Sequence, residues 1–133
     1  MTPEALAALH ARCFPAHPRP WSAAEFSDLI GNRLNFLLIR PQGFLLGRVV
    51  ADEAELLTLA VAPEARRQGL GRALLNEFAL TSSARGAREA FLEVAADNAP
   101  AIALYAGNGW DRAGQRRDYY APGIDAIIMR RGL

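Results

Sequence analysis

The chain has 133 residues, 51% of them hydrophobic, and a formal net charge of +1. This length and apolar content predict one domain, residues 1–133, with a hydrophobic core. The nearly balanced charge argues against nucleic acid or an anionic membrane as a partner.

A single cysteine, Cys13, excludes an internal disulfide and a metal site built from several cysteines, which fits a reducing compartment. Its helical spacing from Leu6 and Leu9 predicts a place in the core. No apolar run approaches the ~20 residues of a membrane-spanning helix, and the N-terminus lacks the features of a signal peptide. We therefore expect a cytoplasmic protein without a metal, with His10 and His17 at the surface and not as ligands.

The first half of the chain predicts two helices and three strands. Thr2-Pro3 is typical of a helix start, and Ser22 with Glu25 forms a capping box for a helix from Ala23 to about Ile30. The intervening segment, Phe14–Trp21, holds three prolines and is expected to be a loop. The apolar runs NFLLIR, GFLLGRVVAD and EAELLTLAVA then predict an antiparallel meander.

The second half predicts a helix from Leu70 to about Ala84 that ends near Gly86, and the strand REAFLEVAA after it. A helix from Asn98 to about Gly107 and the strands WDRAGQRRDYY and IDAIIMRR complete the chain. This order of elements predicts an α/β fold with a mixed, mostly antiparallel sheet flanked by helices.

The stretch VAPEARRQGLGRALL, Val61–Leu75, predicts a strand end, a basic loop and a helix start. A helix N-terminus carries unpaired N–H groups and about half a positive charge, and it therefore attracts anions. Gly69 and Gly71 allow close approach to the backbone, and Arg66, Arg67 and Arg72 add charge. We interpret the loop as a pyrophosphate site; a tight turn with solvated arginines is the alternative. It lacks the Lys-Ser/Thr of a nucleoside-triphosphate loop and the third glycine of a dinucleotide loop.

The run R-x-x-G-x-G, Arg66–Gly71, resembles the acetyl-coenzyme A loop of the GCN5-related N-acetyltransferases (GNAT). The segment FLEVAADNAPAIALYAGNGW is similar to their strand–Asn–helix–Tyr–x–x–x–Gly-aromatic block, so that both signatures together cover roughly Leu56–Trp110. The segments FPAHPRPWS, RRDYY and DAIIM extend the resemblance to the bacterial branch that acetylates the N-terminal alanine of a small-subunit ribosomal protein.

The resemblance implies a GNAT fold whose first strand is shortened or absent, because Met1 lies almost at the first helix. It also implies an acetyl-CoA-dependent enzyme with a protein or peptide N-terminus, of a ribosomal protein, as acceptor. The residues that match the family's acetyl-CoA contacts are Leu59, Ala60, Val61, Arg67, Gln68, Gly69, Leu70, Gly71, Arg72 and Asn98. Glu93 matches the general base and Tyr105 the general acid.

The residues themselves leave other roles open. Glu93 shares a strand face with Phe91 and Ala95, which favours a carboxylate that takes up a proton, although an exposed edge glutamate is the alternative. The phenol of Tyr105 suits a proton donor to a leaving thiolate, yet an aromatic residue on a helix is more often part of the core. Asn98 also fits a helix N-cap.

An α-amine is the favoured acceptor, because removing its proton near pH 7.4 costs roughly 0.8 kcal/mol, against ~4 kcal/mol for a lysine. Trp21 and Tyr119 are the candidate acceptor contacts, but Trp21 fits a hydrophobic staple equally well. Only one of Tyr119 and Tyr120 should face the cleft, since strand side chains alternate. Arg116 and Arg117 are expected on a solvated strand face. A lysine or small-amine acceptor, and a non-catalytic acyl-CoA-binding module, are the rival hypotheses.

Overall fold

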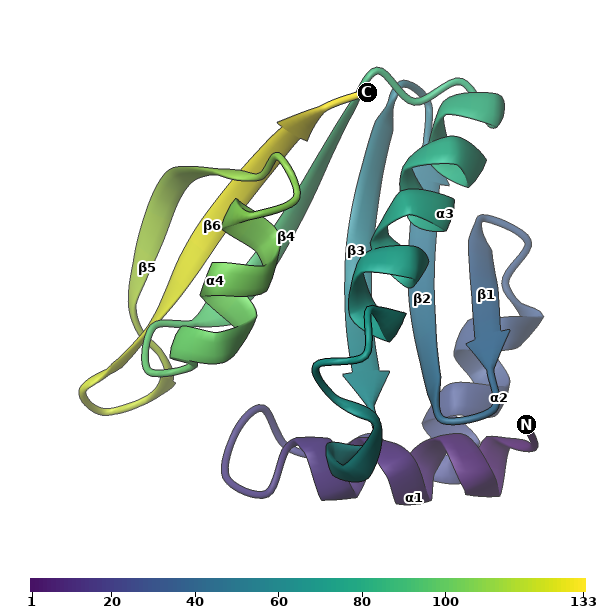
Figure 1. Ribbon diagram of the computed structural model, residues 1–133, viewed down its shortest axis with the longest axis vertical. Coiled ribbons are helices and arrows are strands. Elements are labelled where there is room, and N and C mark those ends of the chain that lie inside the picture. Colours follow the sequence, from purple (N-terminus) through teal and green to yellow (C-terminus); the bar gives the residue numbers. More distant parts are fainter.

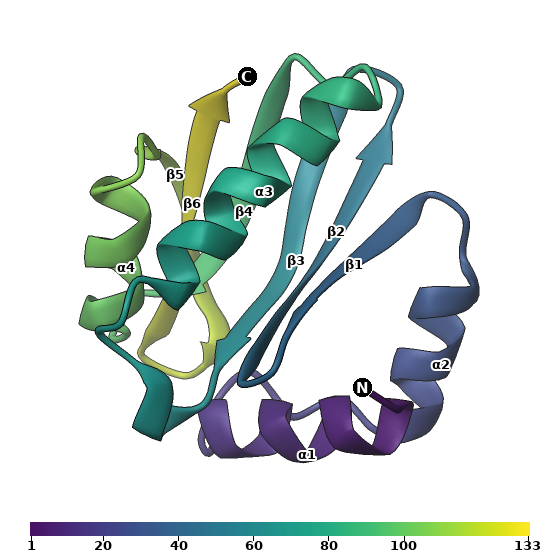
Figure 2. The same ribbon diagram turned by 45° about the vertical axis from the view of Figure 1, so that its right-hand side comes forward.

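The computed structural model describes all residues, Met1–Leu133, and arranges them as a six-stranded sheet with helices on both faces (Figures 1 and 2). The elements are α1 (Pro3–Cys13), α2 (Ala23–Gly31), β1 (Asn35–Arg40), β2 (Gly43–Val50), β3 (Glu53–Val61), η1 (Pro63–Ala65), α3 (Leu70–Ala84), β4 (Glu89–Ala95), α4 (Ala99–Ala106), β5 (Asp111–Ala121) and β6 (Ile124–Gly132). The predicted α/β class is confirmed, and the first element is helix α1 and not a strand.

The sheet has the strand order β1-β2-β3-β4-β6-β5, and every neighbouring pair is antiparallel except β3 with β4. These two strands pair only between Glu53–Glu55 and Glu89–Phe91. Beyond these residues the strands diverge toward the lower end of Figure 1. The backbone of β3 from Leu56 onward therefore has a strand partner on the β2 side alone.

Helix boundaries follow from local chemistry. The Thr2 hydroxyl accepts a hydrogen bond from the Ala5 backbone N–H at 3.1 Å, and Ser22 and Glu25 make both hydrogen bonds of the predicted capping box at 3.1 Å. After α3, Gly86 has a φ of +94°, a left-handed conformation that glycine adopts without strain.

The core has two parts, one on each face of the sheet. Helices α1 and α2 with η1 cover a cluster of seven buried residues that includes Phe26 and Phe44. On the opposite face α3 and α4 contribute to a cluster of 17 buried residues, in which Phe78 lies between Phe36 and Trp110. Truncating a buried phenylalanine such as Phe78 to alanine costs about 3–5 kcal/mol, so this second cluster fixes α3 on the sheet.

His10 is fully buried in α1, so the predicted surface position was wrong. It lies one helical turn after Leu6, within the stripe of α1 that faces the sheet. Its Nδ1 accepts a hydrogen bond from the Trp21 backbone N–H at 3.2 Å, and its ring stacks on the Trp21 ring at 5.0 Å. Burial lowers the pKa of His10 to about 4, because an apolar environment disfavours the charged imidazolium.

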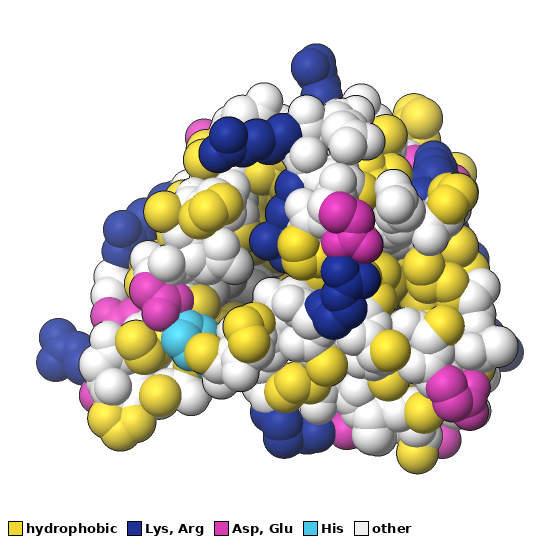
Figure 3. All heavy atoms as spheres, turned by 60° about the horizontal axis from the view of Figure 1, so that its bottom comes forward, with side chains coloured by type: hydrophobic (Ala, Val, Ile, Leu, Met, Phe, Trp, Pro, Cys, Tyr) yellow, Lys and Arg dark blue, Asp and Glu magenta, His cyan; other side chains and the backbone are white.

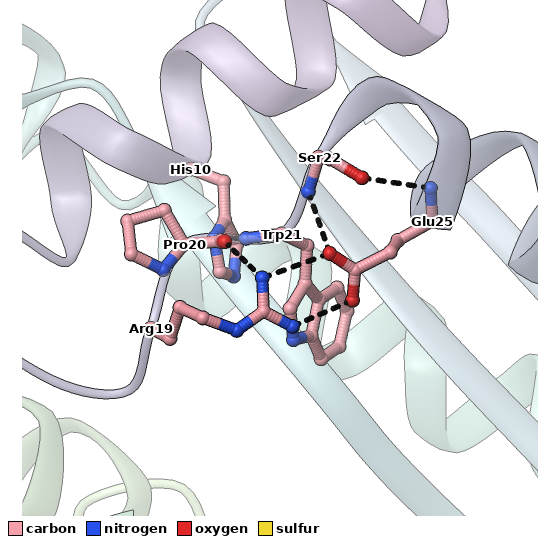
Figure 4. A network of polar contacts seen from close by, with 6 residues as sticks. All are labelled: His10, Arg19, Pro20, Trp21, Ser22 and Glu25. Atoms are coloured by element: carbon pink, nitrogen blue, oxygen red, sulfur yellow. Dashed lines mark hydrogen bonds and ion pairs between the residues drawn. The ribbon is translucent and has the colours of Figure 1, made fainter.

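The loop between α1 and α2 is held in place by a polar network (Figure 4). The Arg19 guanidinium donates to both carboxylate oxygens of Glu25, at 2.9 and 2.8 Å, and to the Pro20 carbonyl at 3.0 Å. The hydrogen bonds from Arg19 and from the Ser22 N–H lower the pKa of Glu25 to about 2. The loop is thus tied to the first turn of α2.

None of the helices is long and apolar enough to cross a membrane.

Candidate active site

A cleft of about 640 Å³ opens where β3 and β4 diverge. Figure 3 views the end of the molecule on which it opens and shows a hollow with basic side chains beside it. Most of the predicted site residues line this cleft: Leu59, Val61, Arg67, Gly69, Leu70, Gly71, Arg72, Glu93, Asn98 and Tyr105. Ala60, Gln68, Trp21 and Tyr119 are not among the lining residues. Ala60 is buried toward α1 and α2, and Gln68 bonds to the Glu64 carbonyl at 3.5 Å.

The loop before α3 presents backbone N–H groups to the cleft. Its N-cap residue, Gly69, has a φ of +81° and no side chain that would cap the helix, and Arg67 also has a positive φ of +63°. Consecutive N–H groups in such a loop form an anion-binding concavity at the positive end of the helix dipole. Arg66, Arg67 and Arg72 line the same wall, and Arg66 is oriented by its hydrogen bond to the Val61 carbonyl at 3.1 Å.

The two glycines of this loop are required for different reasons. A Cβ at Gly69 would meet no atom within 4 Å, so that position needs glycine for its positive φ. A Cβ at Gly71 would lie 3.1 Å from the Leu104 side chain of α4. Gly71 therefore allows the start of α3 to pack closely against the helix that carries Tyr105.

The free edge of β3 forms the apolar part of the cleft. Leu57, Leu59 and Val61 are half-buried there. Cys13 also lines the cleft and donates its S–H to the Val61 carbonyl at 3.3 Å. The half-buried cysteine thus packs against the smaller core cluster, in line with the predicted core position, and also reaches the edge of the cleft.

Glu93 projects from β4 into the cleft, with one oxygen paired and one free. Its Oε1 lies 3.3 Å from Nη2 of Arg116, while its Oε2 is buried and has no hydrogen-bond partner. The Arg116 guanidinium also lies over the Tyr119 ring, 5.2 Å from its centroid. Arg116 is exposed on β5, as the sequence predicted, and from this solvated face its guanidinium also reaches the Glu93 carboxylate.

Tyr105 lies on α4 and is 7% exposed, yet it lines the cleft. Its ring packs edge-on against Trp110 with centroids 6.1 Å apart. Burial, with a smaller contribution from Tyr120, raises the pKa of the Tyr105 phenol above its ordinary value near 10. The hydroxyl is therefore protonated throughout the neutral range.

Tyr120, and not Tyr119, is the tyrosine of β5 that lines the cleft, whereas the sequence analysis named Tyr119 as the candidate acceptor contact. Tyr119 is 52% exposed. Asp118 has a φ of +54°, and the pairing of β5 with β6 shifts register between Arg116 and Ala121. This irregularity sets which tyrosine faces inward. Burial first, and then the charge of Glu93, raises the pKa of Tyr120 to about 12.

His17 also lines the cleft, although the sequence predicted only a surface position for it. Its Nε2 lies 2.8 Å from Oδ1 of Asp97, and its ring centroid lies 5.8 Å from that of Tyr120. The histidine and the aspartate are 80 positions apart, so no local sequence pattern indicates this pair.

Two residues with alternative predicted roles can be placed. The Asn98 side chain accepts a hydrogen bond from the Ala101 N–H at 3.2 Å and so caps α4, while the residue also lines the cleft. Trp21 packs on Phe26, with ring centroids 5.5 Å apart, and it precedes the cap of α2. This contact favours the hydrophobic-staple alternative for Trp21.

This geometry agrees with the comparisons with known proteins. The sequence pattern of the acetyltransferase (GNAT) family matches residues 4–110. The chain belongs to the GNAT family. The sequence is 46% identical over 121 residues to the [ribosomal protein bS18]-alanine N-acetyltransferase of Escherichia coli K12, covering 86% of this chain and 82% of that protein. It is 39% identical over 122 residues to the N-alpha-acetyltransferase RimI of Mycobacterium tuberculosis H37Rv, covering 84% and 75%.

Solved structures of acetyltransferases have a similar fold. The crystal structure of the ribosomal-protein-S18-alanine N-acetyltransferase from Escherichia coli matches with a TM-score of 0.78 and 44% identity, over 95% of this chain and 85% of that chain. Nourseothricin acetyltransferase matches with a TM-score of 0.67 and 29% identity, over 74% and 64%. The present GNAT protein is an acetyl-CoA-dependent N-acetyltransferase. No three His, Cys, Asp or Glu side chains gather in it as a metal site would require.

Proposed function

We propose that this GNAT enzyme transfers the acetyl group of acetyl-CoA directly to the N-terminal α-amine of a small-subunit ribosomal protein that begins with alanine. The observation that carries the proposal is the 46% identity to the bS18-alanine N-acetyltransferase, which extends over 82% of that relative. We further propose that residues 1–133 act as one catalytic domain in the cytoplasm, with neither nucleic acid nor a membrane as a direct partner.

The residues along the cleft fit acetyl-CoA from one end to the other. The uncapped N-terminus of α3 with Arg67 and Arg72 offers N–H groups and positive charge to a pyrophosphate. The unpaired edge of β3, at Leu59 and Val61, offers backbone groups and apolar side chains to the pantetheine arm. Gln68 and Ala60 contribute through their backbone, because their side chains lie outside the cleft.

Acetyl-CoA supplies the thioester, and side chains of the protein accept and donate the protons of the reaction. The free Oε2 of Glu93 accepts a proton from the acceptor amine, directly or through a water. The buried phenol of Tyr105 donates its proton to the departing sulfur. Its raised pKa keeps the proton available, and burial in the same cleft also makes a thiolate more basic.

The acceptor amine enters at the end of the cleft that Tyr120 and His17 line. An α-amine needs less help to lose its proton than a lysine does, because its ordinary pKa is near 8 and not 10.4. A site with a single carboxylate near the reacting atoms therefore favours an N-terminal amine.

The test uses purified protein, acetyl-CoA and two synthetic peptides, with the products weighed by mass spectrometry. One peptide has a free N-terminal Ala-Arg and no lysine, and the other has a blocked N-terminus and one internal lysine. All 15 basic residues of the enzyme are arginine, so acetylation of its own side-chain amines cannot confuse the readout. We expect only the first peptide to gain an acetyl group. Acetylation of only the second, or of neither, would overturn the α-amine assignment.

A further inference from the structure

We propose that His17, oriented by Asp97, is a second proton acceptor of this active site, which takes the first proton from the incoming α-ammonium group. The inference rests on the proposed function, because it concerns an amine that arrives protonated. It assigns a catalytic role to a residue that the family resemblance did not indicate.

The hydrogen bond to Asp97 fixes which nitrogen of His17 is basic. A carboxylate can only accept hydrogen bonds, so the Nε2 of His17, 2.8 Å from Asp97 Oδ1, carries a proton. In the neutral imidazole the lone pair is then on Nδ1. The pair also joins the α1–α2 loop to the loop before α4 across the cleft, so the ring is held by both sides.

His17 lies at the end of the cleft where we propose that the acceptor amine enters. The His17 side chain is 19% exposed and lines the cleft together with Glu93 and Tyr105. Its ring centroid lies 5.8 Å from that of Tyr120, which lines the same cleft as Glu93. The charged or titratable groups that face His17 are Asp97 on the loop before α4 and Tyr120 on β5. Cys13 at the end of α1 lines the same cleft.

Acetylation of an α-ammonium group releases two protons from nitrogen, and the two acceptors divide them. The first proton leaves before attack, when the N–H bond of the ammonium breaks and Nδ1 of His17 takes the proton. The imidazolium passes it to water at the mouth of the cleft. The C–N bond then forms, the C–S bond breaks, Glu93 takes the second proton, and Tyr105 protonates the sulfur. The proton on Glu93 then replaces, through water, the proton that Tyr105 has given up. The sum is ammonium plus thioester giving amide, thiol and one released proton.

An imidazole is better matched to the first transfer than a carboxylate is. A glutamate in water titrates about four pH units below an α-amine, whereas a histidine in water titrates only about 1.5 units below it. Efficient proton acceptors titrate near the operating pH.

The experiment compares wild type with His17→Gln on an Ala-Arg peptide between pH 6.5 and 9.5. Glutamine keeps a donor for Asp97 but cannot take up a proton. We expect kcat/KM for the peptide to fall about 100-fold at pH 7, and the deficit to shrink to about threefold or less at pH 9.5, where the α-amine is mostly neutral. The KM for acetyl-CoA should be unchanged.

A second acceptor separates proton transfer from packing. A peptide whose N-terminal residue is an aza-amino acid carries a hydrazide-type amine in place of the α-amine. That amine is already neutral at pH 7, so His17→Gln should acetylate it nearly as fast as wild type does. Asp97→Asn should show a smaller, about tenfold loss with the same pH dependence, because it removes the charge that orients the imidazole. Arg12→Gln is the matched control and should behave as wild type. It breaks the exposed ion pair of Arg12 on α1 with Glu64 on η1, and neither residue lines the cleft.

Equal losses for His17→Gln at pH 7 and pH 9.5, or equal losses on both acceptors, would overturn the inference, and so would unchanged activity. Failure of the proposed function looks different, since wild type itself would then leave the Ala-Arg peptide unmodified. In that case the same comparison of variants is made on whichever amine wild type acetylates, and the deficit should shrink only as the pH exceeds the ordinary pKa of that amine, near 10.4 for a lysine.

Discussion

The two walls of the cleft are built in different ways. The wall that we propose to bind the pyrophosphate is one continuous stretch, Val61–Arg72, whose N–H groups and arginines are positioned by a strand end and a helix start. The opposite wall collects His17, Glu93 and Tyr120 from three separate segments, and Asp97 of a fourth segment bonds to His17. Anion binding therefore depends on local backbone geometry, whereas the handling of the acceptor depends on contacts between distant parts of the chain.

Tyr105→Phe should give the largest effect on kcat without a matching effect on acetyl-CoA affinity. The ring and its packing on Trp110 are kept, while the proton donor is removed. We expect kcat to fall by about 100- to 1,000-fold with little change in acetyl-CoA affinity. Steady-state thiol release and calorimetric titration measure the two quantities separately. An unchanged kcat would remove Tyr105 from the mechanism.

Acid should lower the stability of the folded protein, because His10 is buried as a neutral imidazole. Its pKa is near 6.5 in the unfolded chain and about 4 in the folded protein, so between these values only the unfolded chain binds a proton. The free energy of unfolding should therefore be unaffected by His10 above about pH 7 and should fall by about 2 kcal/mol between pH 7 and pH 5.

Urea unfolding at several pH values measures this dependence. The comparison is with His10→Gln, which has no imidazole and should lose less stability over the same range. Parallel curves for the two proteins would show that His10 does not contribute.

The affinity for acetyl-CoA should depend on the arginine charges of the wall Val61–Arg72 and not on pH. Replacing Arg67 and Arg72 together with glutamine is expected to weaken acetyl-CoA binding about tenfold, while kcat stays within about twofold, because both side chains line the wall far from the proton transfers. The effect should decrease at high salt. Arg33→Gln, an exposed arginine outside the cleft, is the control, and equal losses in both variants would contradict a specific site.

The smallest expected effect concerns Arg116, the partner of Glu93. This ion pair is partly exposed, and such pairs contribute about 1 kcal/mol or less. Arg116→Gln should thus lower kcat about fivefold or less and leave the KM for acetyl-CoA unchanged. The neighbouring Arg117→Gln is the matched control in steady-state assays. A large loss in acetyl-CoA affinity would contradict this prediction, because it would mean that Arg116 contributes to cofactor binding.

The same contrast explains how much could be predicted from the sequence. The capping box at Ser22, the bounds of α3 and the basic loop before it are set within a few residues of one another, and all were found. The burial of His10 and the inward position of Tyr120 depend on what packs against α1 and on an irregular strand register. The pairs Arg116–Glu93 and His17–Asp97 join residues 23 and 80 positions apart, where spacing rules give no signal.

The contact between Gly71 and Leu104 has a consequence for how this enzyme can evolve. Any side chain at position 71 would meet Leu104, the residue next to Tyr105. A larger residue at position 71 therefore requires that the Leu104 side chain move aside or that position 104 become smaller. Across homologous sequences these two positions should change together, although neither one takes part in the chemistry.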